Sequence, residues 1–198
     1  MNRTSARLVP TVLGAAIAFA PAHLLAQASN QPLPAHERPI APEKNPPGDI
    51  SDNQVFIDYN SPLGFIIKVP EGWVRRQTSD GVTFSDKYNT ITLAVSKHAD
   101  PLTVTSAKQN DIGELEKAGR AVRISGVKSV KLPSGSAVVV SYGSNSEANP
   151  VTDKAIRLEN ERYFFWKNGK LVTLTMSAPF GADNADQWNL MAKSFQWQ

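Results

Sequence analysis

Apolar and polar residues alternate along four short stretches of the chain between residues 54 and 97. A period of two is typical of a strand that buries one face. Turn residues, such as Pro-Glu-Gly at 70–72 and Ser-Asp-Gly at 79–81, separate these stretches. The pattern predicts a run of antiparallel strands. Its apolar positions are Val55, Ile57 and Tyr59, then Phe65, Ile67 and Val69, then Val82 and Phe84, and finally Ile91, Leu93 and Val95.

The middle of the chain changes to a helical spacing over residues 103–118, and Gly119 is a suitable stop. Strands are predicted again at residues 121–124, 128–132 and 137–142. The clearest local signal is Lys167-Asn168-Gly169-Lys170, because Asn-Gly favours the type I′ turn of a tight hairpin. We therefore predict that the long strands on either side, 155–166 and 171–177, form a hairpin.

A second helix is predicted from about residue 183 to residue 195, capped by Asp183 or Asn184. Trp188 and Phe195 are seven residues apart and share a helix face, so we expect them in the core. Helices segregated from antiparallel strands indicate the α+β class. The prediction is an α-β-α sandwich with an antiparallel sheet of about seven to nine strands, one central helix and one C-terminal helix.

The first 28 residues have the layout of a secretory signal peptide. Arg3 and Arg7 precede an apolar stretch, residues 8–20, and Ala26-Gln27-Ala28 matches the small-residue cleavage site. The apolar stretch is shorter than the roughly 20 residues that span a bilayer. We expect cleavage after Ala28, a periplasmic or secreted product, and no membrane insertion after the leader is removed.

Residues 29–52 are rich in proline and almost lack large apolar side chains. Such a segment buries too little surface to offset its ordering entropy, so it predicts a flexible tail. The tail is interpreted as a tether, a docking arm or a plain spacer. The folded domain then covers residues 53–198.

The charge and the cysteine count exclude several classes of protein. The chain has 21 Lys and Arg and 18 Asp and Glu. Removing the two arginines of the leader leaves 19 against 18, which is no basis for nucleic-acid binding through bulk charge. Absence of cysteine excludes disulfides, iron–sulfur clusters, thiolate zinc sites, a catalytic thiol and a lipid-anchored N-terminus.

Candidate catalytic and metal-binding residues are sparse. His23 lies in the leader and His36 in the tail, so a Ser-His-Asp hydrolase would have to use His98, and no G-x-S-x-G motif is present. Three acidic pairs are possible cation ligands, but turns and a helix N-terminus explain each of them more simply. These pairs are Asp80 with Asp86, Asp49 with Asp52, and Asp183 with Asp186. We expect no metal, no cofactor and no catalysis, with a hydrolase as a minor alternative.

Residues 163–166 place two aromatic rings on each face of one strand. One pair can pack on the closing helix, and the other faces either a second layer or a ligand. The polar loops at residues 86–89 and 141–153 could line a groove beside it. The candidate ligand- or partner-binding residues are Arg75, Arg76, Asp86, Tyr88, Asn145, Asn149, Tyr163 and Phe165.

The run from Gly64-Phe65 through Pro70 to Trp73 resembles the opening strand of PsbP-like proteins. The hairpin at 162–177 and the closing Ser194-Phe195 resemble the C-terminal half of the same family, so that the similarity covers about residues 53–197. The resemblance implies an α-β-α sandwich, which the nuclear Ran-release factor shares. Its photosynthetic members are extrinsic, non-enzymatic proteins that dock on a membrane complex and help it to retain calcium and chloride.

The resemblance implies an exported, non-catalytic accessory protein that binds or helps to assemble a partner complex. The ion- and partner-contacting residues of the family do not map onto positions of this chain. A soluble carrier that holds a small ligand on an aromatic sheet face is the alternative. We expect a monomer whose partner is a protein or a small ligand.

Overall fold

The computed structural model describes residues 37–198. The predicted leader and the first residues of the predicted tail lie outside this range. Within it, none of the helices has both the length and the apolar character needed to cross a membrane.

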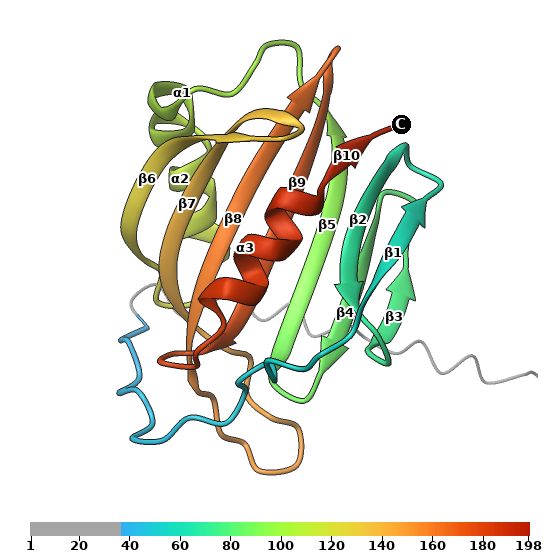
Figure 1. Ribbon diagram of the computed structural model, residues 1–198. Coiled ribbons are helices and arrows are strands. Elements are labelled where there is room, and N and C mark those ends of the chain that lie inside the picture. The colour runs from blue at the N-terminus through green and yellow to red at the C-terminus, as the bar shows by residue number, and fades with distance from the viewer. Residues whose placement is uncertain (1–36) are drawn as a thin grey trace, which may run out of the picture. The chain divides into compact units, whose positions relative to one another are not determined.

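Ten strands form two antiparallel sheets (Figure 1). The seven-stranded sheet has the order β3-β4-β5-β9-β8-β7-β6, and the three-stranded sheet has the order β1-β2-β10. The strands are β1 Phe56–Ser61, β2 Phe65–Pro70, β3 Val74–Gln77, β4 Gly81–Asp86, β5 Asn89–Lys97, β6 Arg123–Leu132, β7 Gly135–Asn145, β8 Arg157–Lys167, β9 Lys170–Pro179 and β10 Gln196–Trp197.

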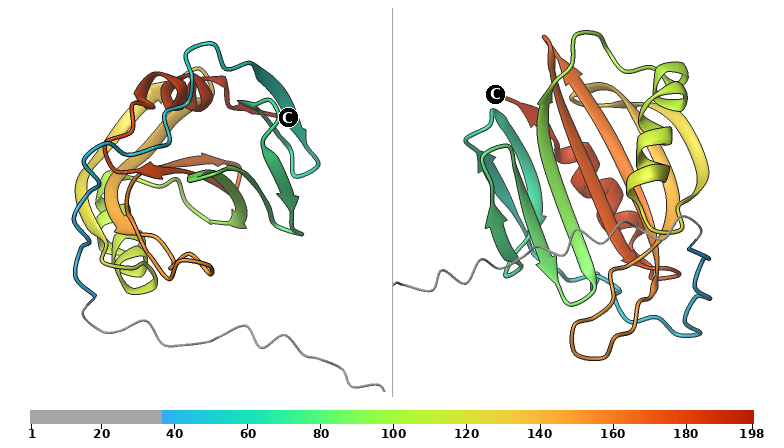
Figure 2. Two further views of the ribbon diagram at one scale, coloured as in Figure 1. Left: turned by 90° about the horizontal axis from the view of Figure 1, so that it is seen from below. Right: turned by 180° about the vertical axis from the view of Figure 1, so that it is seen from behind.

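Helices lie on both faces of the large sheet. Helix α3 (Ala185–Ser194) and the small sheet cover one face, and the short helices α1 (Val104–Gln109) and α2 (Asp111–Ala118) lie on the other (Figure 2). The predicted α+β class and the α-β-α layers are confirmed. The prediction treated the strands as one sheet, whereas β1 and β2 pair with the chain end β10 to form a separate one.

The main core lies between the large sheet and the layer made by α3 and the small sheet. Its largest fully buried side chains include Phe65, Phe165 and Phe195. Trp188 is also buried, so the predicted inward face of the closing helix is confirmed. A second, smaller core beneath α1 and α2 holds Leu115 and Phe164.

The central helix is bent rather than continuous. Asn110 ends α1 and precedes α2, with φ −116° and ψ −67°. Asparagine is a poor interior helix residue because its side chain competes for the backbone. A capping box between Thr103 and Ser106 begins α1, which fits the predicted start at residue 103.

The predicted Asn-Gly hairpin is confirmed. Asn168 and Gly169 have φ values of +49° and +79°, and Lys167 pairs with Lys170 across the two-residue turn. These positive values are those that a type I′ turn requires.

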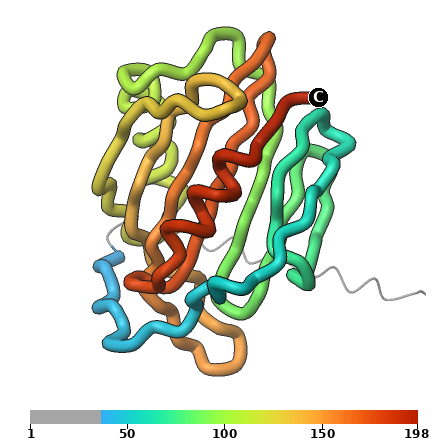
Figure 3. The backbone as a smooth tube through the Cα atoms, viewed as in Figure 1, coloured from blue at the N-terminus to red at the C-terminus, as the bar shows by residue number. Residues whose placement is uncertain are grey.

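Residues 37–50, which we call the arm, lie against the domain although they belong to the predicted tail. Figure 3 shows this segment crossing the end of the domain near the start of α3. Ile50 is only 5% exposed, and its backbone N–H donates to Asn184 Oδ1 at 2.6 Å. The Gly48 carbonyl accepts from Asn89 Nδ2 at 2.8 Å and from Asn184 Nδ2 at 3.0 Å.

The expectation that this segment buries almost nothing does not hold for Ile50, although most of residues 37–50 are exposed. Buried amide side chains of the domain satisfy the backbone of the arm, which supplies the order that the composition of the arm alone does not. Asn184 is at the N-cap position of α3, as predicted, but its side chain binds the arm instead of capping the helix.

Candidate functional site

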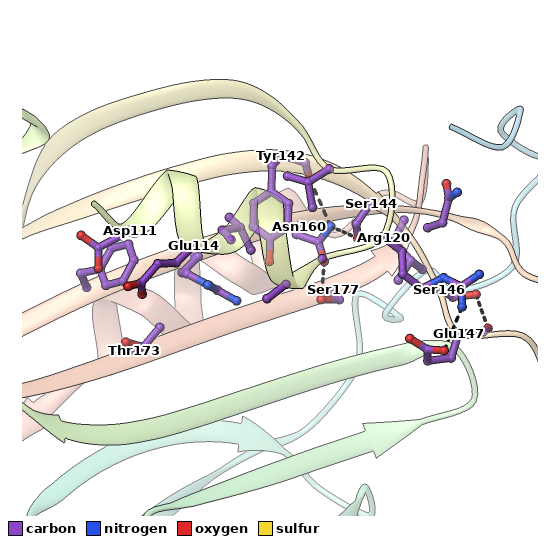
Figure 4. A pocket seen from close by; sticks show the side chains of 18 of the residues that line it. Asp111, Glu114, Arg120, Tyr142, Ser144, Ser146, Glu147, Asn160, Thr173 and Ser177 are labelled. Atoms are coloured by element: carbon purple, nitrogen blue, oxygen red, sulfur yellow. Dashed lines mark hydrogen bonds and ion pairs between the residues drawn. The ribbon is translucent and has the colours of Figure 1, made fainter. Parts of the chain in front are cut away.

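A cavity of about 730 Å³ lies between the α1–α2 pair and the adjacent face of the large sheet (Figure 4). Helix α2 and the segment after it form one wall, and strands β7, β8 and β9 form the floor. The cavity opens to solvent, because the helices lie toward the β6 edge and leave the β4–β5 side of this face uncovered (Figure 2). We call it the polar pocket.

Successive side chains of β8 point to opposite faces of the sheet, and this determines which of them line the floor of the polar pocket. Asn160, Arg162 and Phe164 point to the polar pocket, whereas Tyr163 and Phe165 point to the main core on the opposite face. On this face of β8, the polar residues Asn160 and Arg162 are thus followed by the aromatic residues Phe164 and Trp166.

Asn160 is 5% exposed and joins three neighbouring strands. Its Nδ2 donates to the Tyr142 carbonyl at 3.2 Å and to Ser144 Oγ at 3.0 Å, both on β7. Its Oδ1 accepts from Ser177 Oγ of β9 at 2.5 Å. A buried amide with these partners is satisfied, so it holds the floor in one arrangement.

Arg162 is the cation of the floor. Its Nε donates to Thr175 Oγ1 at 3.0 Å, and its guanidinium carbon lies 5.7 Å from the centroid of the Tyr142 ring. Burial raises the pKa of Tyr142, and the positive charge of Arg162 opposes part of that rise. Among residues 37–198 three ion pairs join side chains, and Arg162 takes part in none of them.

Two carboxylates, Asp111 and Glu114, face the polar pocket from the first turn of α2. Burial raises the pKa of Asp111, against the smaller opposing effects of its own backbone N–H and of the charges on His98 and Arg162. In the described part of the chain, neither carboxylate forms an ion pair. Unpaired charges of both signs therefore line the same cavity.

An ion-pair cluster closes the end of the polar pocket where β7 ends. Arg120 contacts Glu37 of the arm through Nε and Nη2, each at 3.0 Å, and contacts Glu147 through Nη1 at 3.0 Å. Asn145 Nδ2 donates to Glu37 Oε1 at 2.9 Å. The pKa of Arg120 is raised, chiefly by the hydrogen bond to Glu37. The arm is thus fixed at the rim of the site.

Hydroxyl side chains continue the floor beyond the pocket. In one row across the strands, Thr83 pairs with Thr92, Thr92 with Thr175, and Thr175 with Arg162. Thr83 and Thr92 are hydrogen bonded to each other at 3.2 Å. All these side chains are partly exposed. The polar pocket therefore opens onto a sheet face that both donates and accepts hydrogen bonds.

The residues predicted to bind a ligand or partner do not come together. Only Asn145 lines the polar pocket. Arg75 and Arg76 are exposed on the edge strand β3, Asp86 is exposed at the end of β4, and Tyr88 is 47% exposed in the turn before β5. Asn149 is exposed in the loop between β7 and β8, where its Oδ1 accepts from two backbone N–H groups of that loop.

The remaining two candidates, Tyr163 and Phe165, are core residues. Phe165 is 2% exposed beneath Phe195, and the Tyr163 hydroxyl donates to Glu161 at 2.8 Å. Helix α3 covers this face, so the aromatic groove expected there is not open in the described residues. Of the two polar loops, residues 144–147 do line the polar pocket, whereas residues 86–89 do not.

His98 reaches one end of the polar pocket. Its Nδ1 lies 2.6 Å from the Asp100 carbonyl, and its own carbonyl accepts from Trp166 Nε1 at 2.8 Å. Its ring nitrogen thus bonds to its own loop. These contacts do not indicate that His98 acts as a general base.

Arg162 and Asn160 were not among the predicted site residues. Both belong to a strand that the sequence analysis treated through its aromatic residues alone. The available signal was the period of two: Asn160 and Arg162 share a face with Phe164 and Trp166, so a polar patch had to border the aromatic one.

No family model matches the sequence, and no curated protein matches it either. Several solved structures have similar folds, including the following two. Cyanobacterial PsbP (CyanoP) from Synechocystis sp. PCC 6803 superposes with a TM-score of 0.54 at 14% identity, over 76% of this chain and 98% of that one. The Saccharomyces cerevisiae Ran-binding protein Mog1p superposes with a TM-score of 0.51 at 12% identity, over 73% and 96%.

Identities this low show the fold and not the activity. The matches cover nearly the full length of both solved chains, so the shared unit is a whole domain and not a fragment of one. The expected resemblance to PsbP-like proteins is confirmed for the architecture: this chain has the Mog1p/PsbP-like fold.

Proposed function

We propose that this protein is an exported, non-catalytic accessory protein that binds a segment of a protein partner in the polar pocket. The observation that carries the proposal is the floor of that pocket. Asn160 connects three strands through its side-chain hydrogen bonds, and Arg162 beside it forms no ion pair within residues 37–198. A site of this kind is organised before a partner arrives, which reduces the entropic cost of binding.

The shape of the site favours a chain segment over an enclosed small molecule. Pockets for small ligands bury most of the ligand surface. Here the cavity is open and leads onto the row of hydroxyls on β4, β5 and β9. An extended polar segment could contact the pocket and that row together.

The fold gives independent support. Mog1p, which has the same architecture, is described as a Ran-binding protein, so this fold serves protein binding in at least one case. The comparison supports the class of function and says nothing about which partner this chain binds.

Partner capture from a native exported fraction tests the proposal. The bait is the mature domain, and Thr173→Arg is the blocking variant, because Thr173 is a partly exposed residue of the pocket floor. Thr152→Arg is the matched control, since Thr152 is exposed in the loop between β7 and β8. We expect one partner that the wild type and Thr152→Arg retain and that Thr173→Arg loses.

Equal capture by all three proteins would contradict binding at the polar pocket. A thermal-shift screen distinguishes the alternative of a small-ligand carrier, because a ligand that binds the folded state raises the melting temperature by mass action. A compound that stabilises the wild type and not Thr173→Arg would favour the carrier.

A further inference from the structure

We propose that Arg162 receives a carboxylate group of the bound segment. This inference rests on the proposed function, since it names the chemical group that the polar pocket recognises. Neither the fold comparisons nor the predicted site residues assign a role to Arg162.

Contacts within the sheet already hold the guanidinium group of Arg162. Thr175 accepts from Nε at 3.0 Å, and the guanidinium carbon lies over the Tyr142 ring at 5.7 Å from its centroid, so contacts from two different strands restrain the group. An arginine that is already oriented loses less freedom when it binds, and its fork matches the two oxygens of a carboxylate.

Arg162 also has no ion-pair partner among the described residues. Arg162 is partly buried on a sheet floor, and no acid of residues 37–198 pairs with it. The contrast with Arg120 is direct, because Arg120 sits at the end of the same pocket and contacts both Glu37 and Glu147. Asp111 of the same pocket interacts with Arg162 through its charge but forms no ion pair with it, so the guanidinium keeps N–H donors for an anion.

The surroundings supply further donors. Thr173 lies on the same face of β9 as Thr175, which pairs with Arg162 in the sheet register, and both threonines are partly exposed. A hydroxyl that can donate next to a guanidinium adds a hydrogen bond to a carboxylate oxygen. The donors of the site thus come from two adjacent strands of one rigid sheet.

The two acids of the pocket weaken the binding of any anion. Asp111 and Glu114 face the same cavity, and each repels an anion bound at Arg162. A second negative charge on the ligand increases this repulsion and the attraction to Arg162 by the same factor, so charge does not decide between a carboxylate and a phosphate. The carboxylate follows from the proposed function, because it is the anionic group that an unmodified protein segment carries.

The experiment is an NMR titration of the mature protein that follows the Nε–H signal of Arg162, assigned by its loss in Arg162→Lys. The probes are N-acetylglycine, a peptide-like monoanion, its neutral analogue N-acetylglycinamide, and inorganic phosphate, all at constant ionic strength. We expect a saturable shift with N-acetylglycine in the millimolar range. The neutral amide should give no saturation, and phosphate is the comparison anion.

Three variants sharpen the result. Arg162→Gln should weaken N-acetylglycine binding about tenfold or more, read from backbone amides of β9, because a charge-assisted hydrogen bond is lost. Asp111→Asn should strengthen binding by removing a like charge. Arg75→Gln, at an exposed arginine of β3, should leave it unchanged.

Binding that persists in Arg162→Gln, or no saturable binding in the wild type, overturns the inference. Tighter binding of phosphate overturns the choice of a carboxylate. If Arg162→Gln does not fold, Arg162→Lys supplies the comparison, because it keeps the positive charge but loses the planar fork that binds both carboxylate oxygens, and it should also weaken N-acetylglycine binding. A partner captured equally by wild type and Arg162→Gln but lost from Thr173→Arg would leave the proposed function standing and overturn the role of Arg162.

Discussion

The ring of Phe165 in β8 stacks on the ring of Phe195, with 4.0 Å between the centroids and 14° between the planes. Phe195 directly follows α3, and it also contacts Phe65 of the small sheet with centroids 5.7 Å apart. One side chain therefore joins the closing helix, the large sheet and the small sheet. Phe195 is therefore one of the residues through which the two sheets share a core, as is Tyr59 of β1, whose ring lies 5.1 Å from that of Phe84 in β4.

Phe195→Ala should lower the free energy of unfolding by about 3–5 kcal/mol, as expected for a fully buried phenylalanine. A urea titration followed by tryptophan fluorescence measures the change. Leu190→Ala is the control, because Leu190 lies on the same helix but is 41% exposed, and its cost should stay within about 0.5 kcal/mol. Similar costs for both variants would contradict the packing described here.

Asn184→Ala should release the arm. The substitution removes the bonds to the Ile50 N–H and the Gly48 carbonyl, and a buried polar group left without a partner costs about 1–3 kcal/mol. Limited proteolysis should then cut within residues 37–50, where the wild type resists. Asn189→Ala should behave like the wild type, because Asn189 is exposed on α3 and its side chain forms no hydrogen bond within residues 37–198.

The contact between Glu37 and Arg120 predicts that the arm detaches in acid. Burial works to raise the pKa of Glu37, but the hydrogen bonds from Asn145 and Arg120 and the charge of Arg120 outweigh it, so the pKa is lowered from its usual value of 4.5. A lowered pKa means that the contact stabilises the fold above the usual value and is lost as the pH falls through the folded value.

Protease sensitivity of the arm should therefore rise as the pH falls below the usual value of 4.5 and through the lowered pKa of Glu37, because the carboxylate takes up a proton. Glu37→Gln should give a sensitivity that no longer depends on pH through this range. If the wild type and Glu37→Gln respond to acid alike, other groups control the arm.

Two glycine substitutions should change the free energy of unfolding in opposite directions. Gly169 has φ +79° in the hairpin turn, so Gly169→Ala places a side chain in the left-handed region at a cost of about 1–2 kcal/mol. Gly113 lies inside α2 with nothing within 4 Å of an added Cβ, so Gly113→Ala should stabilise the protein by up to about 1 kcal/mol. Thermal unfolding of both variants checks the pair, and a shift of the same sign would contradict it.

Local patterns predicted most of the fold. The Asn168-Gly169 turn and the spacing of Trp188 and Phe195 are properties of short segments, and the structure retains them. The small sheet was not predicted because its third strand, β10, has only two residues and pairs with β2 from the other end of the domain. No periodicity can reveal a strand of that length.

The candidate site was harder to predict because side chains gather there through strand order. Arg162 neighbours Thr175 and Asn160 neighbours Ser177 only because β8 pairs with β9 in one register. The arm was misjudged for a related reason. Its own residues are polar and proline-rich, and its partners Asn89, Asn145 and Asn184 are spread along the rest of the sequence.

The pairing of β10 with β2 also bears on how the protein reaches its native state. Gln196 pairs with Ile66 and Trp197 with Phe65, so the last residues of the chain complete a sheet that β1 and β2 begin. Contacts between segments so distant in sequence form slowly, because a long loop must close before they stabilise anything. A ribosome-bound chain that lacks these residues leaves Phe65 without its cover, so folding of this domain is completed only after synthesis of the C-terminal strand.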